Sequence, residues 1–167
     1  HNSYLFKGTV EENLKMAKPD ATKEEMEAVL QKINLLGFLQ TQDGLQTQLL
    51  EKASNLSGGQ CQRLVIARAL LKEDSKVYIF DEAASNIDVE SEELIMNVIH
   101  NLAKTKTVLL ISHRLANVVK SDKIYFLKDG EIKESGKHEE LMSQNGAYRH
   151  LYESQMALEN YGKGGVA

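Results

Sequence analysis

Two short apolar segments with a helical pattern between them constrain the fold of this 167-residue chain most strongly. Residues 77–80 (Val-Tyr-Ile-Phe) and 107–111 (Thr-Val-Leu-Leu-Ile) have the length and the β-branched or aromatic side chains of buried parallel strands. Between them Asp88 can cap a helix, and apolar residues recur at helical spacing as far as Leu102. A strand, a helix and a second strand in this order predict an α/β fold with a mainly parallel sheet.

The N-terminal part of the chain has helical patterns instead. Three residue pairs fit a capping box, in which a hydroxyl and a carboxylate or amide satisfy the free N–H groups at a helix start. The pairs are Thr9 with Glu12, Thr22 with Glu25, and Ser57 with Gln60. Residues 35–55 show no clear periodicity and predict a mostly irregular connection.

The C-terminal part predicts a β-hairpin followed by helices. The Asp129-Gly130 pair between two apolar runs is typical of a hairpin turn, and helical patterns follow at 139–142 and 146–158. Residues 161–167 are small or polar and predict a flexible tail.

Composition excludes several classes of protein. The near balance of 20 basic and 24 acidic residues, without a basic block, argues against a nucleic-acid partner. The longest apolar runs are far shorter than the roughly 20 residues of a membrane-spanning helix. The single cysteine, Cys61, fits a reducing compartment, and its place near a helix start would somewhat favour the thiolate. Because the first residue is His1 and not Met, we expect the chain to begin inside a longer reading frame.

Chemically versatile side chains follow both predicted strands. Asp81 and Glu82 end the first strand, and His113 follows the second. Because parallel sheets place their ligand sites beyond the carboxyl ends of the strands, we expect these side chains to share one rim. Asp81 would help to hold Mg²⁺ through a water, Glu82 would act on a nucleophilic water, and His113 could donate a hydrogen bond to a terminal phosphate.

Each of these features alone has an ordinary structural explanation. Carboxylates are common at the ends of core strands, and a lone histidine is more often a structural cap than a ligand. A Ser-Gly-Gly segment is most often a turn with a helix cap. The order and spacing of the pieces decide between these explanations.

In that order, the pieces closely resemble the nucleotide-binding domain of ABC ATPases. The segment "LSGGQ" at 56–60 resembles the signature loop, "VYIFDE" at 77–82 the Walker B strand with its catalytic Glu82, "ASNID" at 84–88 the D-loop, and His113 the switch histidine. The segments "GLQTQLLEKASNLSGGQ" and "SDKIYFLKDGEIKESGKHEELM" are similar to exporter-type members. The first ten residues resemble bacterial thiol/cysteine exporter subunits of the CydC/CydD kind.

The sequence departs from the family pattern in two places. His1 falls in register with the glutamine of the Q-loop. No G-x-x-x-x-G-K-[ST], the Walker A phosphate loop, occurs in the 167 residues. We therefore expect a C-terminal fragment that starts at the Q-loop and is inactive alone.

The resemblance implies a fold in three parts. These are residues 1–71 (Q-loop end, helical subdomain and signature helix), residues 72–160 (the C-terminal part of an incomplete P-loop NTPase, or RecA-like, core) and the tail at 161–167.

The resemblance also implies a function, the ATP-binding and hydrolysing part of an ABC exporter at the cytoplasmic face of the cell membrane. Two such domains sandwich ATP and Mg²⁺, and each also contacts the transmembrane domain of its transporter. Residues implied to bind nucleotide or the opposite subunit are Ser57, Gly58, Gly59, Gln60, Asp88 and His1. The alternatives are a non-catalytic interaction fragment and a soluble ABC ATPase that acts on DNA or ribosomes.

Overall fold

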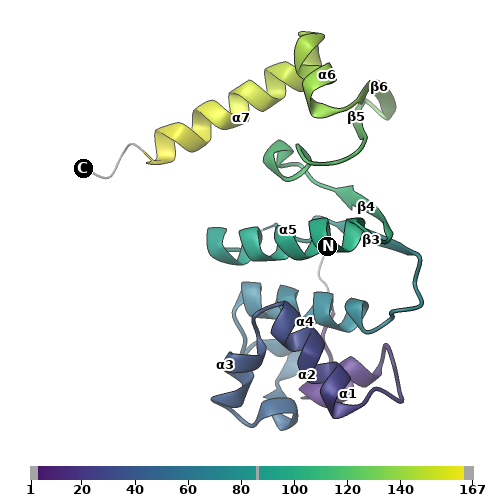
Figure 1. Ribbon diagram of the computed structural model, residues 1–167. Coiled ribbons are helices and arrows are strands. Elements are labelled where there is room, and N and C mark those ends of the chain that lie inside the picture. Colours follow the sequence, from purple (N-terminus) through teal and green to yellow (C-terminus); the bar gives the residue numbers. More distant parts are fainter. Residues whose placement is uncertain (1–3, 86, 164–167) are drawn as a thin grey trace. The chain divides into compact units, whose positions relative to one another are not determined.

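The computed structural model describes residues 4–85 and 87–163, with side chains as far as residue 159 (Figure 1). The contacts divide the chain into two compact units, residues 1–111 and 112–167. The boundary that the sequence predicts after residue 71 lies inside the first unit and remains a prediction.

Three helices of the first unit begin at the predicted capping boxes. They are α1 (Val10–Lys15), α2 (Lys23–Lys32) and α4 (Gly58–Leu70). At the first of them, Thr9 Oγ1 accepts a hydrogen bond from the Glu12 N–H at 3.0 Å, and the Glu12 carboxylate accepts one from the Thr9 N–H at 2.7 Å. These reciprocal bonds satisfy two of the N–H groups that a helix start leaves without a partner.

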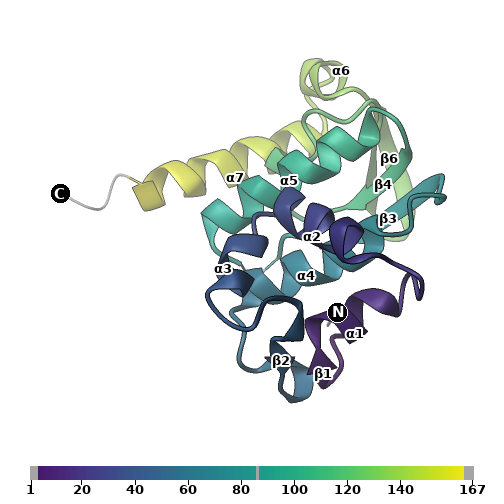
Figure 2. The ribbon, with the colours of Figure 1, turned by 60° about the horizontal axis from the view of Figure 1, so that its bottom comes forward.

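Residues 35–55 contain more structure than the sequence predicts. They form α3 (Leu36–Gln40), the 3₁₀ turn η1 (Gly44–Gln46), β2 (Gln48–Leu49) and the turn η2 (Glu51–Ala53). β2 pairs antiparallel with β1 (Gly8–Thr9), beside α1 (Figure 2). The prediction of a mostly irregular connection was wrong because elements of two to five residues are too short to produce a periodic pattern.

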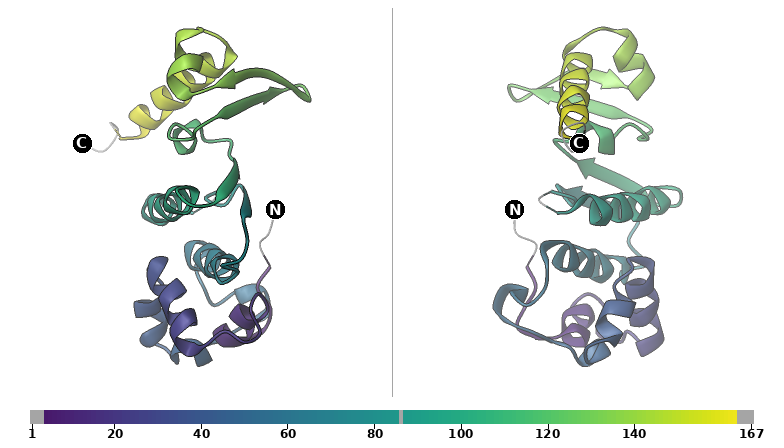
Figure 3. Two further views of the ribbon diagram at one scale, coloured as in Figure 1. Left: turned by 45° about the vertical axis from the view of Figure 1, so that its right-hand side comes forward. Right: turned by 90° about the vertical axis from the view of Figure 1, so that its left-hand side faces the viewer.

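The two apolar segments pair as the parallel strands β3 (Val77–Asp81) and β4 (Thr107–Ile111), joined by α5 (Val89–Ala103). The strand–helix–strand prediction is confirmed. The prediction of fully buried strands is wrong, because Tyr78 and Phe80 are buried whereas Val77 and Ile79 are 58% and 66% exposed. The helices α4 and α5 lie on one side of the pair, so they cover only alternate side chains (Figure 3).

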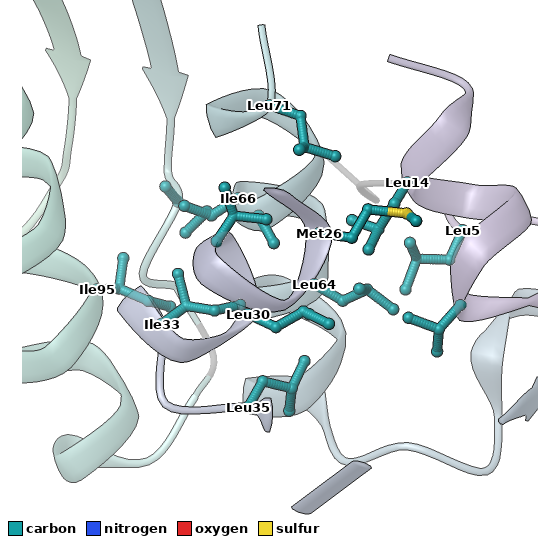
Figure 4. Close-up of a cluster of buried hydrophobic side chains, with 14 of the residues drawn as sticks. Leu5, Leu14, Met26, Leu30, Ile33, Leu35, Leu64, Ile66, Leu71 and Ile95 are labelled. Carbon is teal, nitrogen blue, oxygen red and sulfur yellow. The ribbon is translucent and has the colours of Figure 1, made fainter. Parts of the chain in front are cut away.

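A continuous apolar core joins the helices of the first unit. Leu14 of α1, Met26 and Leu30 of α2, Leu64 of α4 and Ile95 of α5 are all nearly inaccessible to solvent, and Figure 4 shows them converging. Burying one such side chain contributes about 1.5–3 kcal/mol. The core therefore fixes α4 and α5, and the first turns of both helices with them.

The second unit contains the predicted hairpin and helices. Its elements are the 3₁₀ turn η3 (Leu115–Asn117), β5 (Ile124–Lys128), β6 (Glu131–Gly136), α6 (His138–Ser143) and α7 (Ala147–Lys163). β5 and β6 pair antiparallel around the Asp129-Gly130 turn, where both residues have positive φ. The fully buried Tyr148 contacts His138 Nδ1 through its hydroxyl at 2.8 Å. α7 includes the first three residues of the predicted tail, and residues 164–167 lie outside the description.

None of the helices in the described ranges is both long enough and apolar enough to cross a membrane.

Candidate functional site

The first turn of α4 presents exposed hydrogen-bonding groups. Ser57 Oγ accepts a hydrogen bond from the Gln60 N–H at 3.2 Å, and the Gln60 side-chain oxygen accepts one from the Ser57 N–H at 2.9 Å. Ser57 and Gly58 are exposed. Because a helix N-terminus carries free donors and partial positive charge, this turn can receive an anion such as a phosphate.

The first turn of α5 lies against the first turn of α4. Asp88 caps α5, since its Oδ1 accepts a hydrogen bond from the Ser91 N–H at 2.8 Å. A Cβ added to Gly59 would lie 2.5 Å from Ser91 Oγ and 3.1 Å from Asp88 Oδ2. The structure thus brings together Gly59 and Asp88, which belong to two separate motifs of the sequence, the signature loop and the D-loop.

The charge of Asp88 is stabilised by its surroundings. The Ser91 backbone N–H lowers the pKa of the Asp88 carboxyl, and a hydrogen bond from the Ser91 side chain and the positive charge of Arg63 lower this pKa further. The carboxylate therefore stays ionised at neutral pH, between two helix N-termini whose partial positive charges favour it.

Arg63 helps to hold the first turn of α4 in place, and the sequence prediction did not include it. Its Nη1 donates to the Asn34 carbonyl oxygen at 2.9 Å, and its Nε donates to the Gly59 carbonyl oxygen at 3.3 Å. The spacing of four residues between Gly59 and Arg63 places both on one helical face, and this signal could have identified Arg63. The guanidinium ties the first turn of α4 to the end of α2.

Asp81 and Glu82 lie at the carboxyl end of β3, as predicted. Glu82 is half-buried, and its N–H donates to the Ile111 carbonyl oxygen at 2.9 Å. Its φ of 50° is in the left-handed region, which costs a non-glycine residue about 1–3 kcal/mol. Ser85 offsets part of this cost because its N–H and hydroxyl both donate to the Glu82 carbonyl oxygen, at 3.0 and 2.9 Å.

The expectation of a buried strand is wrong at Asp81 too, because this carboxylate is exposed whereas Glu82 is half-buried. The strand alternates, with Phe80 buried and Asp81 exposed on the opposite face. Within residues 4–85 and 87–163, no group of three or more His, Cys, Asp or Glu side chains is placed to hold a metal ion. A single exposed carboxylate nevertheless suits Mg²⁺, which keeps several of its own waters.

His113 belongs to the second unit, whose first residue is Ser112. Two long-range hydrogen bonds from α7 hold its carbonyl and the backbone two residues further on. Gln155 Nε2 donates to the His113 carbonyl oxygen at 2.8 Å, and Gln155 Oε1 accepts a bond from the Leu115 N–H at 2.9 Å. The sequence prediction included neither bond, because the partners lie 40 or more residues apart. His1, the remaining predicted site residue, lies outside the described residues.

Cys61 lies in the first half of α4 and is half-buried. Its Sγ approaches the Ala53 carbonyl oxygen at 3.6 Å. Burial raises the pKa of the Cys61 thiol and outweighs the lowering by the backbone N–H. The expectation that the helix start favours the thiolate was therefore wrong, because desolvation is the larger effect.

Comparison with known proteins gives a consistent match. The model of the ABC transporter family matches residues 1–85, just over half of the chain. An ABC transporter ATP-binding protein of Haemophilus influenzae is 52% identical over 159 residues, which cover 95% of this chain and 28% of that protein. An ATP-dependent lipid A-core flippase of Mannheimia succiniciproducens is 44% identical over 154 residues, 91% of this chain and 26% of the flippase.

A solved structure shows the same fold. A bacterial Atm1-family ABC exporter with ATP bound superimposes with a TM-score of 0.84 at 30% sequence identity. The match covers 93% of this chain and 27% of the exporter chain. The chain thus spans little more than a quarter of the length of these relatives.

Proposed function

Because the chain belongs to the ABC transporter family, we propose that it is part of the ATP-hydrolysing domain of an exporter. One structural observation carries most of this proposal. The first unit holds the "LSGGQ" turn at the start of α4 against the Asp88 cap of α5, and it holds Asp81 and Glu82 at the end of β3. These are among the groups that a nucleotide sandwich requires from one subunit.

The signature turn would act on ATP held by a second subunit. The Ser57 hydroxyl and the N–H groups of Gly58 and Gly59, with Gln60 beside them, would bind the γ-phosphate at the positive end of α4. Asp88 would contact the opposite subunit. A second nucleotide-binding domain is therefore a required partner.

The carboxyl end of β3 would act on ATP of its own subunit. Asp81 would help to hold Mg²⁺ through a water, and this ion would neutralise charge on the phosphates. Glu82 would orient or deprotonate the attacking water, and the left-handed backbone at Glu82 would set the direction of its side chain. His113 would donate a hydrogen bond to the γ-phosphate as negative charge develops, and His1 would contact the site from the Q-loop position.

Transport requires more than these 167 residues. Membrane-spanning domains of the same transporter would be partners, at the cytoplasmic face of the membrane. Since the sequence contains no Walker A loop, we expect the chain alone not to hydrolyse ATP.

A thiol or cysteine substrate is a finer hypothesis. It rests only on the first ten residues. The relatives above include a lipid A-core flippase and an Atm1-family exporter. Transport assays with cysteine and glutathione on vesicles containing the full-length protein would test it.

ATP hydrolysis by the full-length protein tests the proposal. Glu82→Gln should lower kcat by about two or more orders of magnitude while ATP still binds, because only the group that acts on water is lost. Glu73→Gln, a change in the exposed loop between α4 and β3, is the matched control and should leave kcat unchanged. Normal turnover in the Glu82 variant would remove that residue from its role.

A further inference from the structure

The backbone that directly follows His113 is held at two points by one side chain of the C-terminal helix. Gln155 uses both ends of its amide, one as donor to the His113 carbonyl at 2.8 Å and one as acceptor from the Leu115 N–H at 2.9 Å. A planar amide with two bonds fixes both the distance and the rotation of the backbone it meets.

Neighbouring contacts make the same loop rigid. Ser112 Oγ accepts from the Arg114 N–H and donates to the Arg114 carbonyl oxygen, both at 3.0 Å. Arg114 also forms an ion pair with Glu159, one helical turn beyond Gln155, at 3.0 Å. This pair is about one-third exposed on each side, so solvent screens it and it contributes less than the amide bonds.

The buried Leu115 anchors the other end of the loop. Its side chain is 6% exposed, so the backbone cannot shift there without exposing apolar surface. The direction of the His113 side chain is set by its own backbone, and that backbone is bonded directly to α7.

We propose that Gln155 is a positioning residue that acts through His113. By holding the His113 carbonyl and the Leu115 N–H, the backbone that directly follows the histidine, Gln155 fixes the direction in which the imidazole meets a phosphate. The C-terminal helix is then part of the hydrolytic machinery through His113, without a proposed nucleotide contact of its own. This inference rests on the proposed function, because it concerns the step at which His113 meets the γ-phosphate.

Substitutions at Gln155 in the full-length protein test the inference. Gln155→Met keeps the length and bulk of the side chain and removes both hydrogen bonds. Gln155→Glu can still accept from the Leu115 N–H but turns a carboxylate oxygen toward the His113 carbonyl. Ser154→Ala is the matched control, since the Ser154 hydroxyl bonds only to the His150 carbonyl within α7.

Both Gln155 variants should lower kcat for ATP hydrolysis by about tenfold to a hundredfold, because small misplacements of a catalytic group cost this much. The KM for ATP should change less than about twofold, since Gln155 does not bind the nucleotide. In a His113→Ala background, Gln155→Met should cause no further loss. Amide hydrogen exchange of residues 112–118 should become faster in Gln155→Met and stay unchanged in Ser154→Ala.

If the wild-type protein hydrolyses ATP, three results would overturn the role of Gln155 without contradicting the proposed function. They are a normal kcat in Gln155→Met, an equal loss of kcat in the His113→Ala background, or a rise in KM that matches the fall in kcat. A wild-type protein without ATPase activity would contradict the proposed function itself, and the inference would fall with it.

Discussion

Gly59 of α4 and Ser91 of α5 approach each other so closely that any side chain at position 59 would meet the serine. An added Cβ would lie 2.5 Å from Ser91 Oγ and 3.0 Å from Ser91 Cβ. Gly59 is buried and Ser91 is 6% exposed, so neither has free space to move into. The contact therefore joins the signature turn and the Asp88 cap into one rigid part of the same subunit.

Gly59→Ala should destabilise the protein and slow ATP hydrolysis. Overpacking at a buried contact costs about 1–3 kcal/mol, and relief of the clash would displace either the Ser91 hydroxyl or the signature turn. Gly37→Ala in α3 is the matched control, because apart from its chain neighbours and the nearby backbone of its own helix no heavy atom lies within 4 Å of its added Cβ. Both substitutions gain about 1 kcal/mol of helix propensity. The difference in stability between the two variants therefore reports the contact between position 59 and Ser91.

The measurement is the thermal midpoint of the full-length protein, taken together with kcat. The midpoint of Gly59→Ala should fall below that of Gly37→Ala, and Ser91→Gly should recover part of the difference when added to Gly59→Ala. Equal midpoints for the two alanine variants would show that Ser91 does not restrict position 59.

The charge of Asp88 should make stability depend on pH in the acid range. The pKa of the Asp88 carboxyl is lower in the folded protein, first because of the Ser91 N–H, so the unfolded chain binds the proton more tightly. The resulting stabilisation is present above the unfolded pKa of about 3.9 and is lost as pH falls through the folded pKa.

Asp88→Asn tests this dependence because asparagine also caps helices but carries no charge. Between pH 6 and pH 3, the thermal midpoint of this variant should fall less steeply than that of the wild type. Asp74→Asn, at an exposed aspartate in the loop before β3, should keep the wild-type slope. If the thermal midpoints of wild type and Asp88→Asn fall equally steeply with pH, the Asp88 charge does not stabilise the folded protein.

Cys61 should react slowly with alkylating reagents. Burial raises the pKa of its thiol, so little thiolate is present at neutral pH. Iodoacetamide labelling of the native protein should be slower than labelling of a free cysteine at pH 7 and should increase as pH rises above the usual thiol pKa of about 8.5. If Cys61 is labelled faster than free cysteine at pH 7, its thiol is activated instead.

Local sequence signals predict much of this fold. The capping boxes at Thr9, Thr22 and Ser57 depend on residues only three positions apart, and all three form as predicted. The Asp88 cap is equally local. These features could be predicted because both bonding partners lie within one helical turn.

Long-range contacts could not be predicted in the same way. Gly59 and Ser91 are 32 positions apart, and Gln155 bonds to residues 40 and 42 positions away. Alternating exposure along β3 was missed because Val77 and Ile79 are as apolar as the buried Tyr78 and Phe80. A sequence pattern does not show which face of a strand is covered.

The proposed function requires that the first turn of α4 bind the γ-phosphate of an ATP held by a second subunit. Amide hydrogen exchange of residues 55–63 tests it directly, in full-length protein carrying Glu82→Gln, with and without Mg²⁺ and ATP. Residues 20–28 serve as the control, because the Thr22–Glu25 capping box has the same geometry but no assigned role in nucleotide binding. We predict slower exchange of residues 55–63 and unchanged exchange of the control when ATP is bound. Unchanged exchange of residues 55–63 at saturating ATP would rule out phosphate binding by this turn.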